Sequence, residues 1–208
     1  MRSVDDITAA ELLDGLPSRV HEVYAPFVRD TPDHPAFVEG GRSWSYRQFS
    51  EAVDAAAKDL SDLGIRAGDR VMIASENSVA LGAMLFAASK LEAWGIAANP
   101  RLSAREIDLI GTHSGARRVL FNSALSKEAA DHASRIGAKI GAVGPFGGIC
   151  IGPLNADAQP EPVEKDGARQ VAGLLYTSGT TGAPKGVMLS TMQQREGSGA
   201  SCSLTWRP

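Results

Sequence analysis

The chain has 208 residues and a formal net charge of -3, with 43% hydrophobic and 22% charged residues. This composition is typical of a globular protein, and the charges form no block of one sign that would indicate a nucleic-acid partner. The longest apolar run, Val79 to Ala88, is too short to span a bilayer. Cys150 and Cys202 lack the spacing of a metal site or a disulfide framework, and the first residues show no signal-peptide pattern. We therefore expect a cytoplasmic protein with free thiols and no transmembrane segment.

The first part of the chain predicts helices followed by a hairpin. Residues 4–30 carry apolar side chains at helical spacing, and Pro17 interrupts the pattern. Residues 36–45 read as two short strands around the turn signal Gly40-Gly41.

Helices and strands then alternate. Ser45 with Gln48 forms a capping-box pattern, which opens a helix that ends at Gly64, and Ser103 with Glu106 forms a second such pattern. The elements expected next are a buried strand at 71–74, an apolar helix at 79–91, a strand at 94–98, a helix from 104 to Gly115, a strand at 117–121, a helix at 125–136 and a weaker strand at 139–143. This order predicts an α/β fold, with a mostly parallel sheet and helices on both of its faces.

A long connector follows the last of these elements. Residues 145–170 are rich in glycine, proline and acidic side chains, and they show no helical or strand period. We expect this segment to be irregular and to lead into a strand at 174–176.

The stretch from Tyr176 to Val187 reads YTSGTTGAPKGV and lies between two apolar, strand-like runs. Glycines without a Cβ let an anion approach the backbone N–H groups, hydroxyl groups donate further hydrogen bonds to phosphate oxygens, and a lysine adds positive charge. The residues that we expect to bind phosphate are Thr177, Ser178, Gly179, Thr180, Thr181, Gly182 and Lys185. A loop that binds a polyphosphate is the natural interpretation.

Other interpretations of this loop fit less well. A Walker A loop needs Gly before its Lys and Ser or Thr after it, whereas Pro184 and Gly186 stand there. A plain flexible linker seldom lies between apolar strands. A nicotinamide-binding domain would need glycines after its first strand, but Ser-Glu-Asn-Ser follows residues 71–74.

At these residues the chain resembles a known family. YTSGTTGAPKG resembles the signature phosphate loop of the adenylate-forming (AMP-binding) enzymes, which include acyl- and aryl-CoA synthetases, luciferases and the adenylation domains of peptide synthetases. SWSYRQF and KLEAWGIAANP resemble two supporting motifs of the same family. The resemblance stops after Ser190, where Thr191 stands in place of a common histidine. We therefore expect residues 1–190 to be part of an adenylation domain, its N-terminal fragment, and residues 191–208 to be an unrelated, disordered tail.

The resemblance implies an ATP-dependent acid–thiol ligase. Such an enzyme activates a carboxylic acid as an acyl-adenylate and then transfers the acyl group to CoA. The resemblance assigns Ser178–Gly182 and Lys185 to the ATP phosphates, and it assigns no catalytic residue or metal ligand to this chain. The Mg²⁺ ligand is expected from later segments of the family, so we expect the chain alone to be inactive. The alternative is a fragment that binds nucleotide phosphates without turnover; the acid itself is not identified.

Overall fold

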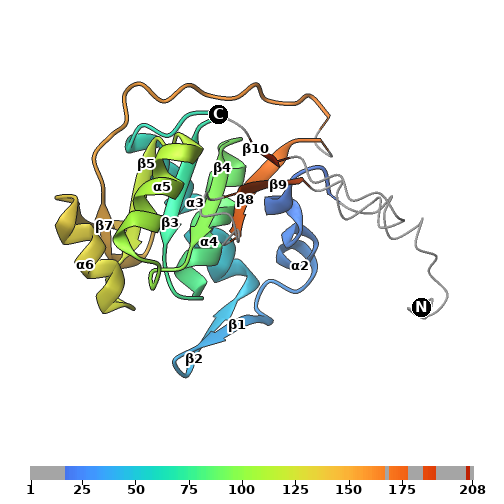
Figure 1. Ribbon diagram of the computed structural model, residues 1–208. Coiled ribbons are helices and arrows are strands. Elements are labelled where there is room, and N and C mark those ends of the chain that lie inside the picture. The colour runs from blue at the N-terminus through green and yellow to red at the C-terminus, as the bar shows by residue number, and fades with distance from the viewer. Residues whose placement is uncertain (1–16, 167–168, 178–184, 191–204, 207–208) are drawn as a thin grey trace.

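A computed structural model describes residues 17–166, 169–177, 185–190 and 205–206 (Figure 1). The described part of the chain contains an eight-stranded sheet in the order β10-β9-β8-β4-β3-β5-β7-β6, and a separate two-stranded sheet of β1 and β2. The strands are β1 (Pro35–Glu39), β2 (Arg42–Ser45), β3 (Arg70–Ala74), β4 (Trp94–Ala98), β5 (Arg118–Asn122), β6 (Lys139–Val143), β7 (Phe146–Ile151), β8 (Val171–Thr177), β9 (Lys185–Ser190) and β10 (Thr205–Trp206). The helices are η2 (Val20–Glu22), α2 (Ala25–Asp30), α3 (Tyr46–Asp62), α4 (Val79–Lys90), α5 (Ala104–Ser114) and α6 (Lys127–Arg135).

The centre of the large sheet is parallel. Strands β4 and β5 both run parallel to β3, and β8 runs parallel to β4 on its other side. Strands added at both edges are antiparallel to their neighbours, with β7 and β6 beyond β5, and β9 and β10 beyond β8. The predicted α/β class, with a mainly parallel sheet, is therefore confirmed, and the antiparallel edges are an addition to it.

Side chains of β3 alternate between two apolar cores. Val71 and Ile73 pack against α3 and α4 on one face of the sheet, whereas Met72 and Ala74 pack against α5 and α6 on the other. All five residues of β3 are buried, as expected for a central strand covered on both sides. The prediction of helices on both faces is thus confirmed (Figure 1).

Local sequence signals begin and end these helices as expected. The Ser45–Gln48 and Ser103–Glu106 capping boxes are both formed, at the starts of α3 and α5. Helix α5 ends at Gly115, which has the left-handed conformation that favours glycine. Gly40 and Gly41 both have positive φ angles, so the predicted hairpin turn between β1 and β2 is also confirmed.

One expectation for the middle of the chain was wrong. Residues 146–151 form β7, although the sequence indicated an irregular connector there. Strand β6 pairs with β7 in an antiparallel hairpin, and β7 lies between β6 and β5 in the sheet. The cause is the tight turn at Gly144, whose positive φ reverses the chain after β6. The glycines of this stretch had hidden the strand, because they lower β propensity.

The irregular connector that follows, from residue 152 onwards, is held by arginine side chains. Guanidinium groups donate to its backbone carbonyl oxygens, which would otherwise lack the partners that a regular strand supplies. These bonds are Arg118 to Gly152 at 2.8 Å, Arg117 to Asn155 at 3.3 Å, Arg66 to Ala158 at 3.0 Å and Arg70 to Gln159 at 2.6 Å. The connector therefore has a defined path from β7 back toward β8.

Asp69 is the buried anion of this arginine cluster. Its side chain has no exposed surface, and its carboxylate lies 3.0 Å from the Arg66 guanidinium and 3.2 Å from Nε of Arg117. The backbone N–H of Arg66 also donates to it, at 2.8 Å. A carboxylate fully withdrawn from water needs such partners, because an unpaired buried charge is strongly unfavourable.

We expect Asp69→Asn to lower the free energy of unfolding by about 3 kcal/mol, because it leaves the guanidinium of Arg117 buried without its anion. Urea unfolding would measure this change. The matched control is Asp62→Asn, which breaks an exposed ion pair with Lys58 and should cost less than about 1 kcal/mol. Equal effects of the two substitutions would contradict the role given to Asp69.

Gly68→Ala should destabilise the fold by about 2–4 kcal/mol, because it combines a strained backbone with a clash. Gly68 has φ +79°, and a Cβ there would lie 2.0 Å from the backbone oxygen of Glu161 in the connector. The control is Gly147→Ala, at an exposed site where a Cβ meets no atom within 4 Å. Its effect should stay within about 0.5 kcal/mol, and thermal unfolding of both variants would decide the comparison.

Candidate functional site

The two ends of the glycine-rich loop are strands of one hairpin. Thr177 is the last residue of β8 and Lys185 is the first residue of β9, and the two residues are paired across the hairpin. The prediction that strands flank the loop is confirmed. Ser178, Gly179, Thr180, Thr181 and Gly182 lie outside the described residues. The structure thus places the stem of the loop, with Thr177 and Lys185 opposite each other where it begins and ends.

Lys185 has an exposed position at the start of β9. The neighbouring Gly186 is buried and pairs with Tyr176. The exposed side chain of Lys185 therefore extends from a backbone that is held in the sheet by the neighbouring pair, which suits a lysine that contacts a ligand. This arrangement fits the role expected of Lys185 toward phosphate, although that role stays a prediction.

The hairpin joins the parallel sheet through a close backbone contact. Among the described residues, β8 is paired with β4 at one position, Gly173 opposite Gly95. A Cβ on Gly173 would lie 2.4 Å from the carbonyl oxygen of Gly95, so only glycine permits this approach. Gly95 is similarly restricted, because a Cβ there would lie 2.6 Å from the Leu85 side chain.

Tyr176 lies at the base of the loop and points toward helix α5. Its hydroxyl oxygen is 2.9 Å from Nδ1 of His113, and the two rings meet edge to face with centroids 5.7 Å apart. Burial raises the pKa of Tyr176 to about 12, against smaller opposite effects from a hydrogen bond to Ser114 and from the charge of Arg70. The sequence indicated strand packing for Tyr176 and gave no reason to connect it with His113, because the two residues are 63 positions apart.

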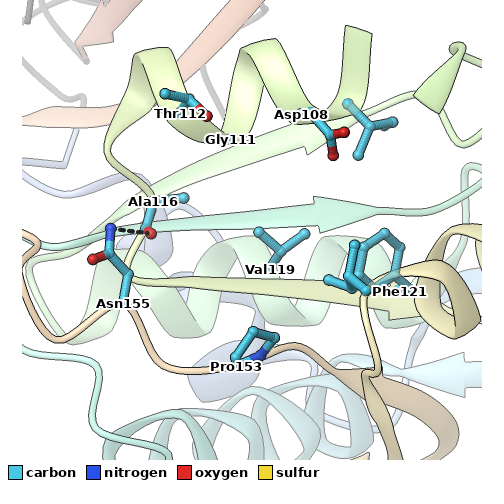
Figure 2. Close-up of a pocket in the computed structure, with 10 residues that line it drawn as sticks. Asp108, Gly111, Thr112, Ala116, Val119, Phe121, Pro153 and Asn155 are labelled. Carbon is cyan, nitrogen blue, oxygen red and sulfur yellow. Dashed lines mark hydrogen bonds between the residues drawn. The ribbon is translucent and has the colours of Figure 1, made fainter. Parts of the chain in front are cut away.

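A separate cleft lies between α5, β5 and the connector. It has a volume of about 390 Å³, and its floor is mainly apolar. In Figure 2, Asp108 and Thr112 come from α5, Val119 and Phe121 from β5, and Asn155 from the connector. The amide of Asn155 donates to the carbonyl oxygen of Ala116, and Asp108 is paired with Arg135 at 2.7 Å. Strands β3 and β4 separate β5 from β8, so this cleft is not part of the loop stem.

A second cavity borders the hairpin on the face of α4. It measures about 300 Å³ and is mostly apolar. Its lining residues come from η2, α4, β4, β8 and β9: Val20, Leu85, Phe86, Gly95, Ala97, Ala172, Gly173, Leu174, Leu175, Leu189 and Ser190. Leu175 and Leu189 are 47% and 43% exposed, so the hairpin is apolar on the face opposite Tyr176.

No cluster of three or more histidine, cysteine or acidic side chains that could hold a metal ion occurs within the described ranges. None of the described helices is both long and apolar enough to cross a membrane.

Comparison with known proteins identifies the class of this α/β domain. The solved N-terminal domain of FACL13 from Mycobacterium tuberculosis, in a complex with an inhibitor, superposes with a TM-score of 0.65 at 27% identity, covering 83% of this chain and 44% of that domain. A fatty acyl CoA synthetase of the same organism gives a TM-score of 0.63 at 25% identity, covering 84% of this chain and 35% of that one. The fold is that of the N-terminal domain of adenylate-forming enzymes.

Sequence comparison identifies the family. A family model described as AMP-binding enzyme matches residues 25–201, so the chain belongs to the AMP-binding enzyme family. The long-chain-fatty-acid–CoA ligase FadD13 of Mycobacterium tuberculosis is 31% identical over 166 residues, covering 76% of this chain and 32% of the ligase. A feruloyl-CoA synthase of Amycolatopsis is 33% identical over 162 residues, with 78% and 31% covered. The chain spans about a third of the length of these ligases.

The raised pKa of Tyr176 predicts a loss of stability at high pH. An unfolded tyrosine loses its proton near pH 10, whereas the folded Tyr176 keeps it up to about pH 12. Between these values the folded state binds more protons than the unfolded state, so the stability present below pH 10 falls as pH rises. Urea unfolding from pH 9 to 11.5 should show a steeper decline in the unaltered chain than in Tyr176→Phe. If the free energies of unfolding of the two proteins fell in parallel with pH, the raised pKa of Tyr176 would be contradicted.

Proposed function

We propose that this chain carries the ATP-phosphate loop of an ATP-dependent acid–thiol ligase. The observation that supports this proposal most is the β8–β9 hairpin, in which Thr177 and exposed Lys185 face each other at the two ends of the loop sequence. The family match and the ligase relatives support the reaction class.

Each residue type in the loop has a role toward the triphosphate. The hydroxyl groups of Thr177, Ser178, Thr180 and Thr181 donate to phosphate oxygens, and Gly179 and Gly182 let those oxygens reach the backbone N–H groups. Lys185 neutralises charge on the β- and γ-phosphates. These contacts hold the polyphosphate so that the α-phosphate is accessible to an incoming carboxylate.

The proposed reaction has two steps. A carboxylate oxygen of the acid attacks the α-phosphorus of ATP, and the bond to the bridging oxygen of the β-phosphate breaks, which releases pyrophosphate. The thiol of CoA then attacks the acyl carbon and AMP leaves. Mg²⁺, when bound, offsets the charge of the phosphate oxygens. Its ligands are expected from later segments of the family, as the resemblance implies.

The substrate is proposed only as a carboxylic acid. The relatives are named for acids as different as long-chain fatty acids and ferulic acid. A cytoplasmic location also remains a prediction from the sequence.

A second candidate is a nucleotide-phosphate-binding fragment without turnover. It rests on the same β8–β9 hairpin, which carries the loop sequence in either case. Both candidates predict binding of Mg·ATP, and they differ in chemistry. Release of pyrophosphate from Mg·ATP by the purified chain, dependent on added carboxylic acids, would support the ligase. Binding without release would support the fragment.

Lys185→Ala should weaken the binding of Mg·ATP by about tenfold or more, because it removes a charge-assisted contact to phosphate. Isothermal titration calorimetry on the purified chain would measure the dissociation constants. The matched control is Lys139→Ala, which removes another exposed lysine at the start of β6, at the far edge of the sheet. Equal affinity of the Lys185 variant and the unaltered chain would remove the role given to this lysine.

A further inference from the structure

The position of Lys185 depends on how firmly the hairpin is attached to the domain. Lys185 is the first residue of β9, which pairs with β8 and with the short β10. Strand β8 is in turn paired with β4 only at Gly173 within the described ranges, whereas β3 and β4 are paired over five positions. Backbone pairing alone therefore gives the loop stem a narrow attachment, and side-chain contacts near the loop must supply the rest.

Tyr176 makes such a contact on the side of α5. It pairs across the hairpin with Gly186, one position from the pair of Thr177 with Lys185. A Cβ on Gly186 would lie 3.1 Å from Cζ of the phenol and 3.2 Å from its oxygen. The ring therefore packs against the backbone of β9 and occupies the space that a side chain at Gly186 would need.

His113 connects this ring to a rigid helix. Its Nδ1 lies 2.9 Å from the phenol oxygen, and its ring meets that of Tyr176 edge to face at an interplanar angle of 88°. Helix α5 is fixed at both ends, by the Ser103–Glu106 capping box and by Gly115 in the left-handed conformation. Ile107 and Ile110 bury the helix against the sheet. The hydrogen bond thus connects the stem of the loop to helix α5, which is capped at both ends and packed against the sheet.

We propose that Tyr176 and His113 act as a positioning pair, which fixes the β8–β9 stem on α5 and thereby sets where Lys185 meets the phosphates. The inference rests on the proposed function, since it concerns the same loop. Electrostatic stabilisation of a polyphosphate depends steeply on the placement of the cation, and a displaced stem moves the lysine with it. Neither side chain needs to touch the nucleotide.

The test is a double-mutant cycle with Mg·ATP affinity as its readout. Tyr176→Phe keeps the ring and removes the hydroxyl, whereas His113→Ala removes the imidazole on the other side of this hydrogen bond. Each should weaken binding by about three- to tenfold, and the double variant should bind no more weakly than either single one, because both break the same bond. His113→Asn, whose amide oxygen reaches the place of Nδ1, should restore affinity close to that of the unaltered chain.

A stability control separates positioning from general loosening of the fold. Val53→Ala, on α3 at the other face of the sheet, removes buried side-chain volume without touching the pair or α5. It should lower stability in urea and leave the affinity for Mg·ATP unchanged. An affinity that follows stability across all variants, additive losses in the cycle, or unchanged binding by Tyr176→Phe would each overturn the inference.

The controls also separate this inference from the proposed function. If Lys185→Ala weakens binding while Tyr176→Phe and His113→Ala do not, the phosphate loop stands and the positioning pair is wrong. If the unaltered chain does not bind Mg·ATP, or if Lys185→Ala binds equally well, both are overturned.

Discussion

The close approach of two backbones, at Gly95 and Gly173, is the constraint on which the candidate site depends. Strand β8 reaches the parallel sheet only where neither residue carries a Cβ. Because Thr177 ends β8 and Lys185 begins β9, this contact places the stem of the loop beside β4, and Tyr176 brings the stem into contact with α5. The site is therefore positioned by backbone sterics in the sheet as well as by residues of the loop itself.

The connector brings β8 to that position, and buried charge holds the connector. Its carbonyl oxygens accept from four arginines, and Asp69 offsets part of the positive charge gathered there. A segment without regular secondary structure must satisfy its backbone groups by other means, and guanidinium groups with several donors are suited to this task. Arg117 and Arg118 also donate to carbonyl oxygens of the turn that follows α3, and Arg70 donates to the turn that precedes β5, so the connector and the sheet are stabilised together.

Sequence patterns predicted the elements well where local physics decides them. The capping boxes at Ser45 and Ser103, the left-handed Gly115 and the Gly40-Gly41 turn each depend on a few neighbouring residues, and all of them are formed. The alternation of helices and strands also sufficed for the α/β class. The sequence failed at β7, because the glycines of this strand mask its β character and pairing with β5 and β6 compensates for their weak propensity.

The sequence by itself determined the family, and its glycines, hydroxyls and one lysine at fixed spacing predict a phosphate loop without reference to the fold. Only the tertiary structure decided which side chains meet at the stem of the loop. His113 and Tyr176 are far apart in the chain, and His113 belongs to no recognisable motif, yet the return of β8 to the centre of the sheet brings the Tyr176 hydroxyl oxygen to 2.9 Å from Nδ1 of His113. Such a contact depends on strand order, and strand order is set by long-range packing that no local pattern encodes.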